Sequence, residues 1–418
     1  MRRKTATGNL AITSRRRRVA YRILVVALVG LLTEIMSCLA IALAPRWLGW
    51  EILRTPEMFD RQSTLIERTL AQRAEALTVF DPRLGWRLRP NSRTSFDQIN
   101  AQGIRSDKEY SKVAKYNTTR IAVFGDSFVY CTEVSDENAW PALIEASFPH
   151  LEVLNYGVPA YGPDQAYLRF HDEAADLSPA VVIMGISPVS LDRSVSVYRS
   201  FITHWQSTAF ATKPRFVLGS DNELILMPNP LAAVADARKY LGQPAAINDL
   251  GKYDYWYEPA IFANPLYDYS MTVRMLTHLW IKVKTRYLDP DRPLVGPAKR
   301  GAFNQRCTAF KIVTKLVEAF IAECKRFGAA PVVVMLPDRY SLQRSLRGVV
   351  TPYAPMVEWC EQHGLCCLDA ANAFPPGDAA QLNDWFMPGS HYSPAGNRFI
   401  AAWLGQQLTG LASKLSKE

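Results

Sequence analysis

Residues 121–127 read Ile-Ala-Val-Phe-Gly-Asp-Ser, an apolar run that ends directly in a small, polar turn. Apolar residues at both odd and even positions are expected of a strand that is buried on both faces of a parallel sheet. A Gly-Asp-Ser turn at the end of such a strand suits the start of a helix, where backbone N–H groups are free. The stretch therefore predicts an α/β fold with Ser127 at the carboxyl end of a buried strand.

Five short runs of this kind occur along the chain, and helical patterns separate them. The clearest helix covers 304–327, with one apolar face. Strands that alternate with helices predict a doubly wound domain, here a flavodoxin-like three-layer α/β sandwich with a five-stranded parallel sheet. The predicted strands are 120–124, 151–156, 180–186, 331–336 and 364–369.

An insertion at about 192–302 interrupts this alternation between the third and fourth strands. An insertion after the carboxyl end of a strand is well placed to shape a substrate cleft. Its aromatic side chains have two interpretations, namely stacking on a carbohydrate or packing in the core of a sub-domain. These side chains are Tyr253, Tyr255, Trp256, Tyr257 and Phe262.

The net charge of +9 is concentrated at the N-terminus, because residues 1–22 contain eight basic side chains and no acidic one. The remainder carries 9 − 8 = +1. Nucleic-acid binding needs a basic face on the folded domain, so this charge pattern argues against it. We expect residues 1–22 to form a basic cytoplasmic tail.

Residues 23–44 form an apolar run long enough to cross a bilayer as a helix. The basic flank before it predicts a single-pass anchor in the cytoplasmic (inner) membrane, with the rest of the chain outside the cytoplasm. A cleaved signal peptide is the alternative, although the run exceeds the usual signal core and Pro45 would follow the cut. Glu34 interrupts the run and marks either a helix contact or a single tolerated acid. Residues 45–80 read as a stalk, and 81–418 as the main domain.

Seven cysteines in 418 residues are too few for a disulfide scaffold. Cys307 and Cys324 lie too far apart on one predicted helix to pair, whereas Cys360 with Cys366 or Cys367 could close a short loop. Neither cysteine nor histidine shows the spacing of zinc ligands, and we expect no metal or other cofactor.

Ser127 is a candidate nucleophile, but a serine hydroxyl needs a base and oxyanion donors. The alternative is that Gly-Asp-Ser only caps a helix. Among the six histidines, His391 stands out because it begins the stretch His-Tyr-Ser-Pro-Ala-Gly near the C-terminus. A serine and a histidine of this kind predict a serine hydrolase type of site.

Three ordered blocks and a lead-in resemble the SGNH (GDSL-type) hydrolase family, especially its membrane-anchored bacterial members. The resemblance spans about 80–410 outside the insertion. It rests on residues 124–128, 133–136 and 140–141 for the first block, 155–162 for the second, 391–397 for the last, and 84–90 with 103–106 for the lead-in.

The resemblance implies that Ser127 is the nucleophile, His391 the base, and Gly157 an oxyanion donor together with Ser127. Two positions depart from the family pattern. No asparagine stands in the third block, where Ser190 is the best match as a donor. The position three residues before the histidine is Pro388 instead of aspartate, which leaves Asp384 to orient His391, or a Ser-His dyad.

The resulting hypothesis is a membrane-anchored serine esterase or O-acyltransferase. It would act on acyl esters, with acetyl favoured, of a cell-envelope or extracellular polysaccharide, and polysaccharide assembly proteins are candidate partners. The alternative is a catalytically impaired SGNH-fold module that binds carbohydrate or presents substrate to a membrane acyltransferase. Loss of function in Ser127→Ala would separate the enzyme from the module.

Overall fold

The structure is a computed structural model of the 418-residue chain. It describes residues 6–48, 51–71, 77–202, 212–233, 235–241, 243–295, 301–377 and 380–415.

The chain divides into two compact units, and each is described by itself. The helical unit comprises Met1–Arg61 and Glu258–Leu288, and the sheet unit comprises Gln62–Tyr257 and Asp289–Glu418. The helical unit contains α1 (Ala6–Leu48), the start of α2 (Thr55–Leu70), α10 (Pro259–Phe262), α11 (Met271–Val283) and the π-helical turn η3 (Lys284–Leu288). Part of the predicted insertion, residues 258–288, therefore belongs with the N-terminal segment.

The centre of the sheet unit is a five-stranded parallel sheet in the order β13-β12-β7-β5-β6. Counted along the chain, this is the 2-1-3-4-5 order of flavodoxin-like folds. The predicted fold class is confirmed, with every strand shifted by no more than a few residues. The strands are β5 (Thr119–Phe124), β6 (Leu151–Asn155), β7 (Val181–Ile186), β12 (Ala330–Met335) and β13 (Cys367–Asp369).

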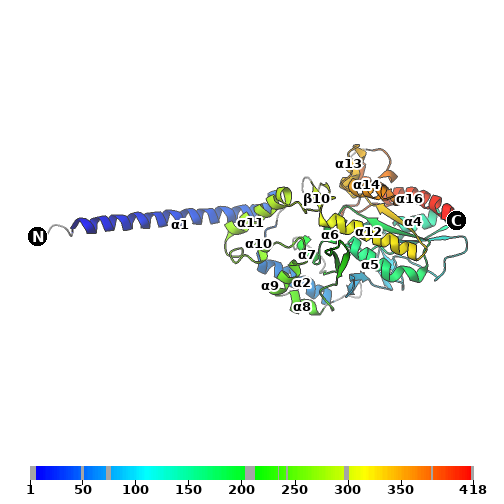
Figure 1. The fold of residues 1–418 in the computed structure, drawn as a ribbon, viewed down its shortest axis with the longest axis horizontal. Helices are drawn as coiled ribbons and strands as arrows, with labels where there is room; N and C mark the ends of the chain where they lie inside the picture. The colour runs from blue at the N-terminus through cyan, green and yellow to red at the C-terminus, as the bar shows by residue number, and fades with distance from the viewer. Residues whose placement is uncertain are drawn as a thin grey trace. The chain divides into compact units, whose positions relative to one another are not determined.

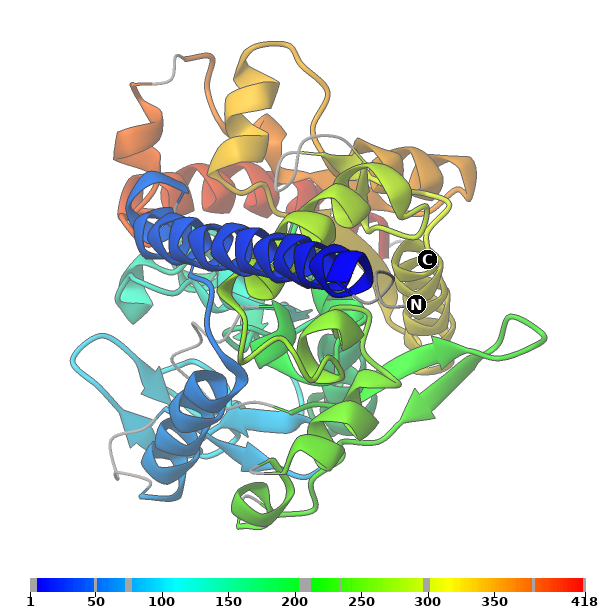
Figure 2. The same ribbon diagram turned by 90° about the vertical axis from the view of Figure 1, so that its left-hand side faces the viewer.

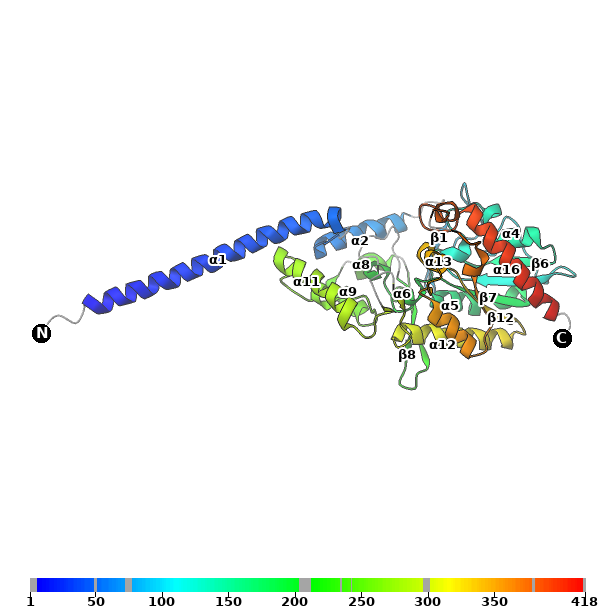
Figure 3. The same cartoon turned by 90° about the horizontal axis from the view of Figure 1, so that it is seen from above.

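Helices cover both faces of this sheet (Figures 1 and 3). This explains why its strands are apolar at both odd and even positions. Ala122 and Phe124 of β5 point into a core shared with α5 and α12. Ile121 and Val123 point to the other face, where α4 and α16 pack. The covering helices are α4 (Trp140–Ser147), α5 (Pro163–Glu173), α12 (Thr308–Arg326), α14 (Ala354–Gln362) and α16 (Pro394–Leu415).

Short elements complete the sheet unit. The lead-in forms two small hairpins, β1 (Thr78–Asp81) with β2 (Gly85–Leu88) and β3 (Ser92–Arg93) with β4 (Gln98–Ile99). In the insertion, β8 (Arg215–Leu218) and β9 (Leu224–Met227) form a hairpin that projects from the unit (Figure 2). The remaining elements are α3 (Ser127–Tyr130), η1 (Asp136–Asn138), η2 (Ala174–Leu177), α6 (Ser190–Ser194), α7 (Arg199–Ile202), α8 (Asp236–Leu241), α9 (Pro244–Gly251), β10 (Leu294–Val295), β11 (Ala302–Phe303), α13 (Arg339–Leu346), η4 (Ala370–Ala373) and α15 (Leu382–Trp385).

Helix α1 contains the predicted membrane span. Among the described residues, one helical stretch, Arg15–Arg46, is long and apolar enough to cross a membrane, judged by length and composition. All seven cysteines are free thiols, and the thiols of Cys360 and Cys367 are hydrogen-bonded to each other.

Candidate active site

The candidate nucleophile lies in a tight turn between β5 and α3. A Cβ atom on Gly125 would come within 2.5 Å of Val129 Cγ2, so the turn leaves room only for glycine there. Asp126 caps the helix, because its carboxylate accepts a hydrogen bond from the Phe128 N–H at 2.9 Å. The capping role foreseen for this turn is therefore present, and Asp126 performs it, which leaves the Ser127 side chain for another partner.

That partner is His391, which comes from the loop before α16. The Ser127 hydroxyl lies 2.9 Å from His391 Nε2, and His391 Nδ1 lies 2.8 Å from a carboxylate oxygen of Glu133. A carboxylate can only accept, so it fixes the ring proton on Nδ1 and leaves Nε2 free to accept from the serine. Ser127 is 6% exposed, and the His391 and Glu133 side chains are about a quarter exposed. The three groups form the linear arrangement of a Ser-His-acid triad.

The structure does not bring Asp384 to His391, contrary to the expectation from its position in the sequence. Asp384 is exposed on α15, and its described hydrogen bonds use only its backbone, which accepts from the Ser393 hydroxyl and donates to the Gln381 carbonyl. The acid beside His391 is Glu133, which follows Ser127 by six residues. Sequence reasoning missed Glu133 because it searched for an acid beside the histidine, although Glu133 stands within the first family-like block.

The Glu133 carboxylate holds the backbone of the histidine loop as well as the ring. It accepts from the Gly389 N–H at 2.9 Å and from the His391 N–H at 3.3 Å. A Cβ atom on Gly389 would lie 2.4 Å from the carboxylate oxygens, so a glycine allows this approach. Burial alone would raise the pKa of Glu133, but the hydrogen bonds from His391 and Gly389 outweigh it, and the pKa lies below its ordinary value.

Several residues near the triad have a strained backbone conformation. Four residues of the candidate site that are neither glycine nor asparagine have a positive φ, a conformation that costs energy for such side chains. Such outliers are typical of functional sites. They are Cys131 (65°), Glu133 (76°), Ala160 (71°) and Ser390 (75°).

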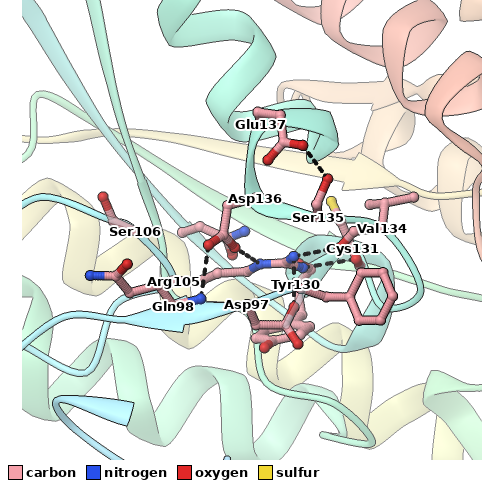
Figure 4. A network of polar contacts seen from close by, with 12 residues as sticks. Asp97, Gln98, Arg105, Ser106, Tyr130, Cys131, Val134, Ser135, Asp136 and Glu137 are labelled. Carbon is pink, nitrogen blue, oxygen red and sulfur yellow. Dashed lines mark hydrogen bonds and ion pairs between the residues drawn. The ribbon is translucent and has the colours of Figure 1, made fainter. Parts of the chain in front are cut away.

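Arg105 from the lead-in holds the loop that carries Glu133 (Figure 4). Its buried guanidinium donates to the carbonyl oxygens of Tyr130 at 2.5 Å and Cys131 at 2.8 Å, before Glu133, and of Val134 at 2.6 Å, after it. The guanidinium also forms ion pairs with the carboxylates of Asp97 and Asp136, each with a nitrogen–oxygen distance of 2.7 Å. Arg105 of the lead-in therefore fixes the loop on both sides of Glu133. This is a structural role for the lead-in, which in the sequence was recognised only by its resemblance to the family.

Asp126 also ties the nucleophile turn to the segment after β7, where the family pattern has its third block. Its second carboxylate oxygen accepts from the Ser187 hydroxyl at 2.6 Å and from Arg193 at 2.9 Å. The same Arg193 nitrogen donates to the Tyr161 carbonyl at 2.8 Å. One arginine thus joins the first, second and third blocks beside Ser127.

The predicted oxyanion donors have different surroundings. The Ser127 N–H has no acceptor among the described residues, as a donor to substrate requires. The Gly157 N–H donates to the Asn155 side chain at 3.0 Å, and the Ser190 hydroxyl accepts from the Ser187 N–H at 3.1 Å. These two groups are therefore engaged in local turns.

Another backbone donor stands in the loop of Gly157. From Tyr156 to Gly162, each N–H has an acceptor except that of Ala160, within the part of the chain that the structure describes. Pro159 has no N–H at all. The loop lies against the nucleophile turn, because the Val158 N–H donates to the Gly125 carbonyl at 3.0 Å. The positive φ of Ala160 is a property of the folded chain, so the sequence offered no signal for this donor.

One buried acid near the third block remains partly unpaired. Burial raises the pKa of Asp192 to about 7, against the opposing effect of Arg193. Its Oδ1 atom has no hydrogen-bond partner. A carboxyl in this state is partly protonated near neutral pH, and it opposes folding when it ionises.

The aromatic residues of the insertion mainly make contacts within the sheet unit. Trp256 donates to the Asp192 carbonyl at 3.0 Å and packs edge-on against Tyr255, whose hydroxyl donates to Asp289 at 2.5 Å. Tyr257 donates to Asn248, and Tyr253 is half exposed. These contacts match the interpretation of a sub-domain core for Tyr255, Trp256 and Tyr257.

Comparisons with known proteins add the following findings. No protein-family model matches the chain, and a search of curated proteins finds no match. Solved structures that are similar include a G-D-S-L family lipolytic protein from Desulfitobacterium hafniense DCB-2, at 13% identity and a TM-score of 0.34, covering 69% of this chain and 99% of that one.

Two further similar structures are hydrolases by their descriptions. One is an acylhydrolase from Bacteroides fragilis NCTC 9343, at 11% identity and a TM-score of 0.33, covering 71% of this chain and 89% of that one. The other is an acetyl xylan esterase, at 10% identity and a TM-score of 0.33, covering 69% and 98%. Scores this low carry no conclusion about the chemistry, which is read from the site itself.

Proposed function

We propose that the chain is a membrane-anchored serine enzyme that cleaves or transfers acyl esters, with Ser127, His391 and Glu133 as its triad. The hydrogen-bonded series from the Ser127 hydroxyl through His391 to Glu133 is the observation that carries this proposal. Ser127 and Glu133, six residues apart after β5, meet His391 from near the C-terminus in the order that nucleophilic catalysis requires. The presence of an acid beside His391 favours this enzyme over an impaired module or a Ser-His dyad.

In the proposed reaction, the Ser127 oxygen attacks the ester carbonyl while His391 Nε2 takes the hydroxyl proton. Glu133 keeps the other ring proton on Nδ1 and stabilises the imidazolium that forms. His391 then gives its proton to the leaving alcohol, and an acyl-serine remains. Water, or a sugar hydroxyl, attacks the acyl-serine in the reverse sequence and regenerates the Ser127 hydroxyl.

The oxyanion of the tetrahedral intermediate would be held by the N–H groups of Ser127 and Ala160. Neither N–H has another acceptor among the described residues. Ala160 also has a positive φ, which is an unusual conformation for alanine. The loss of one such donor typically costs about 10²–10³ in rate. A backbone pair would compensate for the asparagine that the third block lacks.

The proposed substrate is an acyl ester, in particular an acetyl ester, of an envelope or extracellular polysaccharide at the outer face of the cytoplasmic membrane. This part rests on the apolar α1 helix with its basic flank and on the sequence resemblance to anchored bacterial members. Acyl transfer requires that a bound sugar hydroxyl competes with water for the acyl-serine, whereas hydrolysis needs only water.

The test is hydrolysis of a small acetyl ester by the full-length chain in detergent, with covalent labelling by a fluorophosphonate probe. We expect turnover and labelling in the wild type, and the loss of both in Ser127→Ala. His391→Ala should also lose turnover. The matched control is Asp384→Asn, which removes the nearest acid to His391 in sequence while leaving the triad intact.

An absence of Ser127-dependent turnover together with an absence of labelling would contradict the enzyme and favour a binding module. Labelling without turnover on the small ester would point to a transferase that needs its own acyl acceptor. The addition of acetylated and deacetylated oligosaccharides would then separate transfer from hydrolysis.

A further inference from the structure

Glu34, the acidic residue in the apolar run of α1, caps the start of α11. Its carboxylate accepts from the Ser270 hydroxyl and from the backbone N–H groups of Met271 at 2.7 Å and Thr272 at 3.4 Å. The two backbone N–H groups are donors that the first turn of a helix leaves without intrahelical partners. A negative charge at this end is also favoured by the helix dipole. The contact therefore satisfies an acid that would be costly in a bilayer.

A second polar pair lies one helical turn further along α1. The hydroxyls of Ser37 and Thr272 are 3.1 Å apart, and Ser37 is 1% exposed although most of α1 is open. Glu34, Ser37, Ile41 and Ala44 follow a helical spacing of three or four residues, and they are the less exposed positions of this part of α1. Small and polar residues along one face are typical of contacts between helices within membranes.

The outer face of α11 is apolar and uncovered. Leu276, Leu279, Trp280 and Val283 are between 43% and 55% exposed, and they recur at helical spacing. No acidic residue occurs in 271–288, and three basic ones follow Leu279, namely Lys282, Lys284 and Arg286. Figures 1 and 3 show α11 beginning beside α1 within the helical unit.

The position of Glu34 in the apolar run determines what can cover this face. Glu34 lies ten residues before Ala44, about 15 Å along the helix axis from the end of the run. If the run spans the bilayer, Glu34 lies within the membrane, and the first turn of α11 that is bonded to it lies there too. The first turn of α11 would then start inside the bilayer, and lipid acyl chains would cover the apolar side chains that follow it from Leu276 on.

We propose that α11 is a second membrane element, which enters the leaflet that holds the C-terminal half of the apolar run and presents Leu276, Leu279, Trp280 and Val283 to lipid. The proposal rests on the membrane anchoring of the proposed function. Trp280, Tyr287 and the basic residues at the end of α11 suit the interface, where aromatic rings and basic side chains meet the headgroups. The insertion after the third strand thus contributes a segment that binds the bilayer beside α1.

The test is photolabelling of the full-length chain in vesicles of phosphatidylethanolamine and phosphatidylglycerol. A phospholipid with a diazirine in its acyl chain is activated by light, and the labelled residues are mapped by mass spectrometry. We expect label on 23–44 and on 271–288. The matched control within the same molecule is the β8–β9 hairpin, where Ile225 and Leu226 are exposed to a similar extent, 43% and 38%, and should receive severalfold less label.

Label on 23–44 but not on 271–288 would overturn the proposal while the anchor stands. Label on neither segment would contradict the anchor itself, without bearing on the triad. Crosslinking of 271–288 to another protein in native membranes, in place of lipid, would also overturn it.

A substitution tests the role of Glu34. Glu34→Leu keeps α1 apolar but removes the acceptor for the first turn of α11, so label on 271–288 should fall at least twofold relative to label on 23–44. Equal labelling in the variant would show that Glu34 does not hold α11 in the leaflet.

Discussion

Glu133 binds His391 through both its ring and its backbone. One carboxylate oxygen lies 2.8 Å from His391 Nδ1 and 3.3 Å from the His391 backbone nitrogen, although 258 residues separate the two along the chain. The acid of the proposed triad therefore comes from the loop after the nucleophile. The same carboxylate orients the ring and holds the loop on which the ring stands.

The substitution Glu133→Gln tests this relationship. Gln keeps the size of the side chain but loses the charge that stabilises the imidazolium, so we expect kcat for an acetyl ester to fall about 10²–10⁴-fold. Asp384→Asn is the control, and it should stay within about twofold of wild type. The reverse result, a loss in Asp384→Asn with Glu133→Gln unaffected, would contradict the assignment.

Gly389→Ala should displace the Glu133 carboxylate without touching Ser127. The added Cβ would lie 2.4 Å from the carboxylate oxygens, which is closer than such contacts allow, so the flexible carboxylate must move away from the loop. We expect kcat to fall at least about tenfold while KM changes little, as for the loss of an interaction in the transition state. Gly410→Ala is the control, because nothing lies within 4 Å of its added methyl. If Gly389→Ala costs as much in a Glu133→Gln background as in wild type, the glycine acts by another route.

Arg105→Lys should loosen the loop that carries Glu133. Lysine retains the charge beside Asp97 and Asp136 but cannot donate in a fork to the carbonyls on both sides of the acid. We expect lower kcat with similar KM, together with a lower melting temperature, because buried contacts are lost. A lower kcat at temperatures where the variant is fully folded would separate positioning of the acid from mere destabilisation. Arg93→Lys, at an exposed lead-in position, should change neither quantity.

Asp192→Asn should stabilise the sheet unit at high pH. Burial raises the pKa of Asp192 to about 7, whereas an aspartate in an unfolded chain has a pKa of about 3.9. Between these values the folded state binds more protons than the unfolded state, so the contribution of Asp192 to stability falls as pH rises. The gain in melting temperature from Asp192→Asn should therefore grow from pH 4 to pH 7 and then level off. A constant difference across this range would exclude the ionisation of Asp192 as its cause.

The contribution of the Glu133 carboxylate to stability changes with pH in the opposite direction to that of Asp192. Its pKa is lowered in the folded state, so its contribution to stability is present above about pH 4.3, the ordinary value, and is lost as pH falls through the folded pKa. Melting curves of Glu133→Gln and wild type should therefore converge in acid. They should differ most at neutral pH.

The sequence by itself determined the parallel sheet and the nucleophile and base of the proposed relay. The strands around Ser127 were predictable because burial on both faces imposes a local pattern, and Ser127 and His391 stand in short motifs. Glu34 was also recognisable locally, as an acid in an apolar run. These features depend on neighbours in the sequence, which a single chain displays directly.

Only the tertiary structure decided which groups those residues meet. Asp384 is close to His391 in sequence yet exposed, whereas Glu133 reaches the ring because the end of β5 and the loop before α16 come together at the carboxyl edge of the sheet. In the same way, the partner of Glu34 is the first turn of α11, more than 230 residues away. Contacts between distant segments follow from packing of the whole fold, and no spacing in the sequence specifies them.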